Sequence, residues 1–323
     1  MDKVSIIVPI YNVAPYLERC LDALLSQTYP NIEIVLVDDF SRDRSPDIMR
    51  QYAQKDPRVC CVFQPENRGV SAARNAGLDK AGGDWVCFCD GDDWFEPDYV
   101  EKMLRCAQEN SADYILCDYQ IASDGRNAIP VRCTANFETG CDKRVVMACG
   151  PLSSCTHMVK KGLFDRSGVR YPTGCRQYEE LPVIPALASF SRRIGVVHLP
   201  LYNYYQRGNG SSASNAGLDS EAQFKTALAA LKAVVGEAYD LELEYLSIYA
   251  LHYGVILSLC KKGAPANVIR EKIADFESQF PNYLANPYLK YMGRAKRLFL
   301  RFVSKKCVAG LRLLAWVHSK IVK

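Results

Sequence analysis

The segment 87–94, which reads CFCDGDDW, joins a short apolar stretch to a turn that carries three carboxylates. Carboxylates that crowd together raise one another's pKa unless a cation offsets their charge. Asp-x-Asp on a glycine-containing turn at a strand end is therefore typical of a site for a hard divalent ion. Mg²⁺ and Mn²⁺ prefer oxygen ligands and commonly bridge protein carboxylates to substrate phosphates. The alternative for this motif taken alone is a solvated acidic turn.

The residues around this turn predict the elements that must position it. Between residues 4 and 118, nearly continuous apolar stretches alternate with amphipathic ones, which indicates an α/β fold: a Rossmann-like, mostly parallel sheet with flanking helices. We expect strands at 4–10, 32–38, 59–63, 85–89 and 114–117. We expect helices at 16–26, 46–55, 70–81 and 98–110. Short strands at 155–159 and 196–199 and a helical region from about 219 complete the prediction.

Polar clusters follow three of these strands, at 11–12, 38–39 and 90–92. Ligands of parallel α/β sheets bind beyond the carboxyl ends of the strands, so three clusters at one edge predict a binding site there. The loop after the first strand reads YNVAP rather than G-x-G-x-x-G, and G-x-x-x-x-G-K-[ST] does not occur in the sequence. The sequence therefore disfavours a dinucleotide, S-adenosylmethionine or P-loop site.

Composition narrows the class of protein. Of 323 residues, 49% are hydrophobic and 24% are charged, which is typical of a globular chain. A strand pattern begins at Val4, so we expect no signal peptide, and the stretch 246–260, which contains His252, is predicted to be a buried helix rather than a membrane span. The 14 cysteines include no C-x₂-C pair, and we interpret them as reduced core residues of a cytosolic protein.

The end of the chain has a charge pattern of its own. Residues 290–323 contain ten basic and no acidic residues, and because the whole chain is +4, the part before them is −6. Leucine and aromatic residues alternate with these cations, which is typical of a helix bound at an anionic membrane surface. The alternatives are a helix packed on its own domain and, less favoured, a nucleic-acid contact.

Five segments in order resemble motifs of the family 2 glycosyltransferases: VSIIVPIYN (4–12), LSQTY (25–29), VDD (37–39), NRGVSAARN (67–75) and DGDDW (90–94). The resemblance is close to about residue 118 and weaker to about 215. It implies the GT-A fold, with a C-terminal helical region beyond it, and inverting transfer of a sugar from a nucleotide sugar. We expect a catalytic domain at 1–215 (nucleotide-binding half 1–118, acceptor half 119–215), a helical region at 216–286 and a basic tail at 287–323.

The resemblance also implies roles for single residues. Asp39 would accept the N–H of a uracil base. Asp90 would contact the ribose or the sugar, and Asp92 would be the ligand of Mg²⁺ or Mn²⁺. The other residues implied for the nucleotide site are Pro9, Tyr11, Asn67, Arg74 and, as a weaker candidate, Arg68. Taken alone, Arg74 is equally a surface residue of its helix.

Two further residues are implied for the reaction itself. Arg207 would contact the diphosphate, with the small residues 208–212 as a mobile lid; the alternative is a plain loop arginine. Glu180 would be the general base, although the family commonly has Glu-Asp where this chain has Glu179-Glu180. The alternative for Glu180 is a helix cap. Phe40 is a second departure, because the family usually has glycine at that position.

The resemblance thus predicts a metal-dependent glycosyltransferase of cell-surface polysaccharide synthesis. The cysteines and the basic tail predict that it lies in the cytoplasm, peripheral on the inner face of the plasma membrane. Its partners would be a nucleotide-sugar donor, by resemblance a UDP-sugar, and a glycan or lipid-linked acceptor. Thymidine diphosphate would also suit a carboxylate-to-imide contact. A membrane-associated nucleotide-sugar-binding module with weak or no turnover is the alternative. A nucleotidyltransferase would need a glycine- and lysine-rich N-terminal loop, which the sequence lacks.

Overall fold

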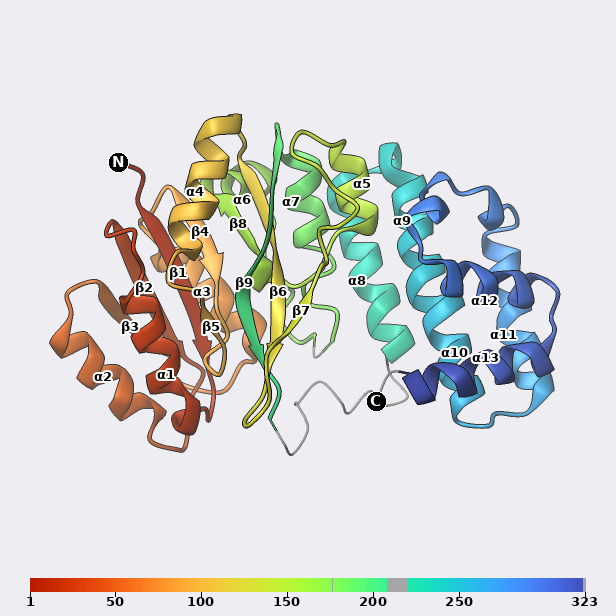
Figure 1. Ribbon diagram of the computed structural model, residues 1–323, viewed down its shortest axis with the longest axis horizontal. Helices are drawn as coiled ribbons and strands as arrows, with labels where there is room; N and C mark the ends of the chain where they lie inside the picture. The colour runs from red at the N-terminus through yellow and green to blue at the C-terminus, as the bar shows by residue number, and fades with distance from the viewer. Residues whose placement is uncertain (176, 208–219, 322–323) are drawn as a thin grey trace. The chain divides into compact units, whose positions relative to one another are not determined.

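The structure, a computed structural model, describes residues 1–175, 177–207 and 220–321 of the chain (Figure 1). The chain forms two compact units, Met1–Val234 and Val235–Lys323. The predicted boundary at 215/216 lies outside the described residues, and the predicted boundaries at 118/119 and 286/287 stay predictions.

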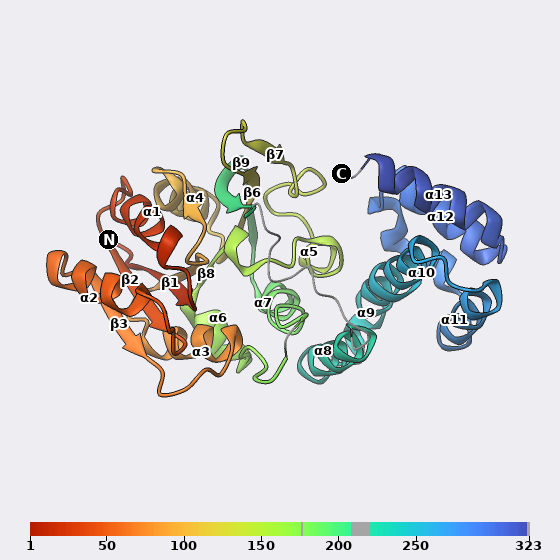
Figure 2. The same cartoon turned by 90° about the horizontal axis from the view of Figure 1, so that it is seen from below.

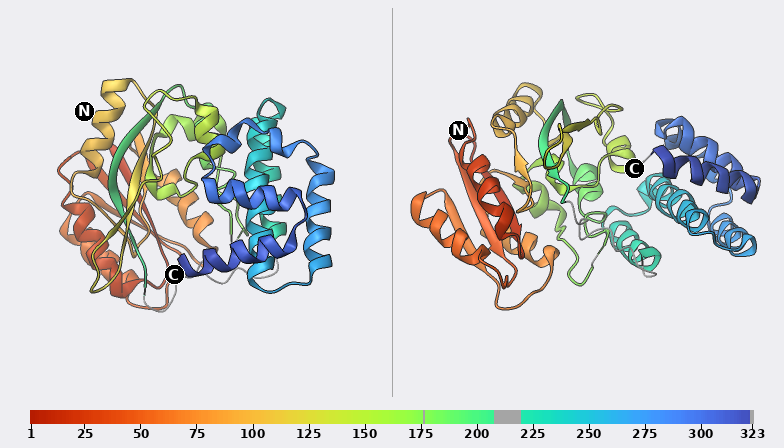
Figure 3. Two further views of the ribbon diagram at one scale, coloured as in Figure 1. Left: turned by 45° about the vertical axis from the view of Figure 1, so that its right-hand side comes forward. Right: turned by 60° about the horizontal axis from the view of Figure 1, so that its bottom comes forward.

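The first unit is built on a mixed sheet. Its N-terminal half is parallel and is formed by β3 (Val59–Phe63), β2 (Ile32–Asp38), β1 (Val4–Ile10) and β4 (Trp85–Phe88), in that order. The sheet continues through β8 (His157–Lys160), β6 (Tyr114–Ala122), β9 (Ile194–Tyr205) and β5 (Trp94–Phe95), with β7 (Ile129–Val131) paired to β6. β8 is antiparallel to both of its neighbours, whereas β6 and β9 are parallel and run side by side (Figure 3).

Helices cover both faces of this sheet, and in Figure 2 α1 and α4 lie on one face and α3 and α6 on the other. The bounds are α1 (Ala14–Leu25), α2 (Ser45–Lys55), α3 (Val70–Lys80), α4 (Tyr99–Asn110), α5 (Lys143–Cys149), α6 (Lys161–Ser167), α7 (Ile184–Phe190) and α8 (Ser220–Val235). α3 approaches β1 so closely that a Cβ on Gly77 would lie 2.3 Å from Ile7 Cγ2. The α/β fold and the helical C-terminal region predicted from the sequence are confirmed.

The second unit is helical. Its elements are η3 (Glu237–Tyr239), α9 (Asp240–Ser247), the π-helical η4 (Ile248–Val255), α10 (Ile256–Lys261), α11 (Ala266–Gln279), η5 (Tyr283–Ala285), η6 (Pro287–Tyr291), α12 (Arg294–Ser304) and α13 (Val308–Ile321). In the described part of the chain, one helical stretch, Glu237–Lys261, is long and apolar enough to cross a membrane. However, 56% of its most apolar window is buried inside the protein, which a core helix would also show.

Candidate active site

The first part of the site lies beyond the carboxyl ends of β1 and β2. Asp39 follows β2 and is buried, and its two carboxylate oxygens accept the backbone N–H groups of Arg68 and Gly69, each at 2.8 Å. Asn67 Nδ2 donates to the backbone oxygen of Asp39 at 3.1 Å. Asp39 therefore holds the loop that leads into α3. Each of its oxygens keeps a second lone pair for a ligand, and its contact with a uracil base stays a prediction.

Tyr11 begins the loop after β1, which runs beside the loop that carries Asp39. The backbone N–H of Asp39 donates to the oxygen of Ile10 at 2.8 Å, so the two loops that follow β1 and β2 run together. The ring of Tyr11 is half exposed and Pro9 is partly exposed at the end of β1, which suits an aromatic stacking surface. Both loops use a left-handed residue, Asn12 at φ 52° and Phe40 at φ 64°.

The acidic turn after β4 is fixed by an arginine that sequence reasoning missed. Arg19 Nη2 donates to the backbone oxygen of Asp92 at 2.8 Å. Its guanidinium lies over two aromatic rings, 4.0 Å from the centre of Trp94 and 4.1 Å from that of Tyr205. These contacts join α1 to the acidic turn and to the end of β9. No sequence motif marks Arg19, since it lies on an ordinary amphipathic helix.

Asp92 itself forms an ion pair with Arg207. The Oδ2 atom of Asp92 lies 2.6 Å from Arg207 Nη2. Burial raises the pKa of the Asp92 carboxyl, and the charge of Asp90 raises it further, while Arg207 opposes both. The predicted lid at 208–212 lies outside the described residues.

Asp93 ties the turn to β9. It is 1% exposed and accepts hydrogen bonds from the Tyr202 hydroxyl and from the backbone N–H of Tyr205, the latter at 2.8 Å. Burial, with the charges of Asp90 and Asp92, raises the pKa of Asp93 to about 8. Arg207 follows Tyr205 by two residues. By holding the backbone of Tyr205, Asp93 therefore also positions the backbone that leads to Arg207.

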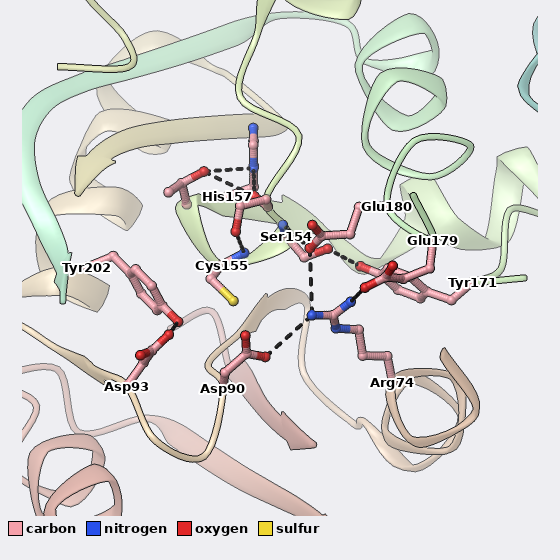
Figure 4. A network of polar contacts seen from close by, with 12 residues as sticks. Arg74, Asp90, Asp93, Ser154, Cys155, His157, Tyr171, Glu179, Glu180 and Tyr202 are labelled. Carbon is pink, nitrogen blue, oxygen red and sulfur yellow. Dashed lines mark hydrogen bonds and ion pairs between the residues drawn. The ribbon is translucent and has the colours of Figure 1, made fainter. Parts of the chain in front are cut away.

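Arg74 joins the acidic turn to the Glu179-Glu180 pair (Figure 4). It comes from α3, is 4% exposed, and its guanidinium lies 3.4 Å from Asp90, 3.3 Å from Glu179 and 3.6 Å from Glu180. Burial disfavours its charge, but Glu180 and Asp90 outweigh that effect and keep the pKa of Arg74 above its ordinary value. The described contacts of Arg74 are thus with three carboxylates and with the ring of Tyr171, whose centre lies 5.3 Å from the guanidinium. Its predicted contact with the nucleotide stays a prediction.

Glu180 is held in one orientation. Its Oε1 accepts the backbone N–H of Ser154 at 2.6 Å, and the Ser154 hydroxyl lies 2.7 Å from the hydroxyl of the buried Tyr171 (Figure 4). Burial and the charge of Glu179 raise the pKa of the Glu180 carboxyl, while Arg74 and Ser154 oppose them. A carboxyl with a raised pKa suits proton transfer near neutral pH. Sequence reasoning missed Ser154 and Tyr171, which lie in an irregular region without a motif.

The donor set fits a divalent ion only together with a substrate. Among the described residues, no group of three His, Cys, Asp or Glu side chains is arranged to hold a metal. Mg²⁺ is commonly bound by one or two carboxylates plus substrate phosphates, and Asp90 and Asp92 supply such a pair on one turn. The raised pKa of Asp92 is consistent with a carboxylate that lacks a full complement of positive charge.

Comparison with known proteins identifies the family to which the N-terminal half of the chain is similar. Residues 5–166 match the family model described as Glycosyl transferase family 2. The chain is 48% identical over 118 residues to Glycosyltransferase GlyA of Streptococcus pneumoniae serotype 4, a match that covers 36% of this chain and 17% of that protein. It is 32% identical over 220 residues to the uncharacterized glycosyltransferase EpsJ of Bacillus subtilis, covering 64% of this chain and 62% of EpsJ. The chain therefore matches less than two thirds of the length of either relative.

A solved structure resembles nearly the whole chain. S. aureus TarS 1-349 in complex with UDP-GlcNAc has a TM-score of 0.71 and 20% sequence identity, and the match covers 98% of this chain and 92% of that one. At this identity the similarity establishes the fold, including a helical region after the α/β unit.

Proposed function

Since this chain belongs to glycosyl transferase family 2, we propose that it moves a sugar from a UDP-sugar to a glycan or lipid-linked acceptor, with inversion at the anomeric carbon. The observation that carries the proposal is the bridge formed by Arg74. One buried guanidinium contacts Asp90 on the acidic turn and Glu180 on the other side of the site. A carboxylate for the donor, Asp90, and a carboxylate for the acceptor, Glu180, are thereby fixed in one network.

The donor would be bound by the strand-end loops of the first unit. Tyr11 offers a ring for the base, and Asp39 offers the free lone pairs of a buried carboxylate. UDP as the carrier rests on the family motifs and on UDP-GlcNAc in the TarS complex, whose fold this chain shares. Asp90 and Asp92 would hold Mg²⁺ or Mn²⁺, which when bound offsets the negative charge of the diphosphate leaving group.

Glu180 would act as the general base. Its carboxylate takes the proton of the acceptor hydroxyl while that oxygen forms a bond to the anomeric carbon. At the same time the bond from that carbon to the β-phosphate oxygen breaks, and the nucleoside diphosphate leaves with the electron pair. A single displacement inverts the centre, so an α-linked donor gives a β-linked product. Arg207 would contact the departing diphosphate, since guanidinium pairs well with phosphate oxygens.

Glu180 departs from the family by one methylene, and its contacts support the proposed role. The carboxylate is anchored by the Ser154 N–H at 2.6 Å and lies 3.6 Å from Arg74, so its reach is set by fixed partners. The alternative role as a helix cap fits less well, because α7 begins at Ile184 and the carboxylate bonds to Ser154 instead.

We place the enzyme at the inner face of the plasma membrane in this proposal, where a lipid-linked glycan of a cell-surface polysaccharide would be its acceptor. The support is the basic, apolar-rich end of the chain, which has ten basic and no acidic residues between 290 and 323.

The test is a screen of UDP-, GDP- and dTDP-sugars for binding and for release of the nucleotide, with and without Mn²⁺ or Mg²⁺. We expect metal-dependent release of UDP that falls at least about a hundredfold in Asp92→Asn, with Asp165→Asn, an exposed acid of α6, as the matched control. UDP-sugar binding without turnover on any lipid-linked acceptor would instead favour a binding module. Absence of nucleotide binding would contradict both.

A further inference from the structure

Two adjacent helices of the second unit carry exposed side chains that the proposed reaction does not use. α12 and α13 lie side by side, as a layer beside α9–α11 in Figure 2. The two helices approach so closely that a Cβ on Gly310 would lie 2.4 Å from the ring of Phe302.

Both helices bury one face against the continuous helix formed by η4 and α10. The buried side chains of α12 are Phe299, Leu300 and Val303, and those of α13 are Val308, Leu311 and Ala315. Phe299 packs edge-on against Tyr253 of η4 with ring centres 5.3 Å apart. Because α12 and α13 pack on the same helix, the face of each that is opposite its buried side chains is directed away from that helix.

The solvent-exposed face of α13 is apolar, whereas the exposed face of a helix in a water-soluble protein is usually polar. Leu313 is 61% exposed and Trp316 is 60% exposed, and Val317 beside them is also exposed. Trp316 and Val317 each lie about one helical turn from Leu313, so the three residues share one side of the helix. Lys320 follows on the same side, with its ammonium group 6.0 Å from the centre of the Trp316 ring.

The outward face of α12 supplies positive charge that the protein leaves uncompensated. Arg294, Arg297 and Arg301 of α12 and Lys305, which directly follows the helix, are exposed, and their side chains form no ion pair with another described residue. By contrast, the neighbouring Lys306 does pair with Glu277 at 3.1 Å.

We propose that α12 and α13 form a bilayer-binding surface, in which Leu313, Trp316 and Val317 enter the headgroup region while the arginines of α12 contact anionic lipid headgroups. Exposed tryptophan and leucine beside unpaired cations match the physical requirements of an interfacial helix, which lies in the membrane plane. A second copy of the chain is a poor occupant, because it would bring the same unpaired cations face to face. The inference deepens the proposed membrane location and names its surface.

Sedimentation with vesicles tests the surface. The full chain is expected to bind vesicles of phosphatidylcholine with phosphatidylglycerol but not vesicles of phosphatidylcholine alone. Leu313→Ser/Trp316→Ser and Arg297→Glu/Arg301→Glu are each expected to weaken this binding at least about tenfold. Matched controls are Leu284→Ser, a half-exposed leucine of η5, and Arg270→Glu, an exposed arginine of α11.

The fluorescence of Trp316 provides a second readout, which is measured on the wild-type chain and so does not depend on whether a variant folds. Trp85 is buried and Trp94 is partly buried, so a blue shift of tryptophan emission on adding vesicles should arise from Trp316 and vanish in Trp316→Phe. Equal binding by both double variants would overturn the proposal, as would equal binding to neutral vesicles. So would a wild-type dimer that these variants dissociate while vesicle binding is unchanged.

Failure of this surface and failure of the proposed transfer are distinguishable. Release of UDP in solution should be the same in the surface variants as in the wild type, because none of the substituted residues lies in the first unit. Vesicle binding, in turn, is measured without nucleotide, so it is unaffected by whether a donor is ever found.

Discussion

The guanidinium of Arg207 lies 2.6 Å from the carboxylate of Asp92, so the cation proposed for the diphosphate pairs with the proposed metal ligand. The two roles compete, because a guanidinium and a divalent cation on one carboxylate repel each other, so we expect Arg207 to leave Asp92 when the donor arrives with its metal ion. Both side chains are partly exposed, at 30% for Arg207 and 22% for Asp92, which allows such an exchange.

This ion pair predicts that one substitution of Arg207 lowers turnover but raises the affinity for Mn²⁺. Arg207→Ala should lower turnover by about a hundredfold, because a charged contact with the leaving group is lost. The same variant should bind Mn²⁺ about fivefold more tightly in the absence of nucleotide, since a partly exposed ion pair of about 1 kcal/mol no longer competes for Asp92. Titration followed by electron paramagnetic resonance measures the metal affinity. Arg105→Ala, an exposed arginine of α4, is the matched control, and an unchanged Mn²⁺ affinity would contradict the exchange.

Glu180 gives the second prediction. Glu180→Gln should reduce kcat by about 10³-fold with little change in donor affinity, because the proton acceptor is removed while the amide keeps the Ser154 contact. Glu179→Gln is the neighbouring control and should reduce kcat far less. Turnover by Glu180→Gln at the wild-type rate would exclude Glu180 as the base.

The raised pKa of Glu180 also sets the sign of the pH dependence. A general base acts in its ionised form, so kcat should rise with pH until the Glu180 carboxyl is deprotonated and then level off. Because burial moves that pKa upward, the rise should lie at higher pH than for an exposed glutamate. In Glu180→Gln the remaining activity should lose this rise, which a pH profile of single-turnover rates would show.

The parts of the fold with a strong local pattern were predictable. Strands β1 and β2 begin and end where their apolar stretches predict, because a strand covered on both faces is apolar throughout. The edge strand β3 also has its predicted ends, although most of its residues are only partly buried. β9 was predicted only at 196–199 but runs from Ile194 to Tyr205, since its exposed residues interrupt the apolar pattern. β6 likewise continues to Ala122 beyond the predicted 117.

The site was predictable only where a motif marks it. Asp39, Asp90 and Asp92 follow strands, so their types and positions together indicated a ligand. The contacts of Arg74 with Glu179 and Glu180 join residues more than a hundred positions apart in the sequence, and no local pattern reports such a contact. Arg19 and Ser154 were missed for the same reason.

Asp93 gives a prediction for stability. Its pKa rises from 3.8 to about 8 on folding, so the folded protein binds a proton there more tightly than the unfolded chain. Its stabilising contribution is therefore full below pH 3.8 and is lost as pH rises through about 8. The free energy of unfolding of wild type should fall with pH more steeply than that of Asp93→Asn, by up to about 1.4 kcal/mol per pH unit. Urea unfolding between about pH 5 and pH 8 measures both slopes, and Asp165→Asn should keep the wild-type slope.

Phe40 gives the last prediction. It follows β2 and Asp39, and its φ of 64° lies in the left-handed region, where a side chain costs about 1–2 kcal/mol. A contact between its ring and Arg42, whose guanidinium lies 4.1 Å from the ring centre, partly offsets this strain. Phe40→Gly removes the backbone strain along with that contact, so the free energy of unfolding should change by less than about 1 kcal/mol. Phe40→Val keeps the strain, adds a branched Cβ and loses the arginine contact, so it should destabilise by about 2 kcal/mol. Thermal unfolding of the two variants decides the matter, and equal destabilisation by both would show that the ring rather than the backbone limits this position.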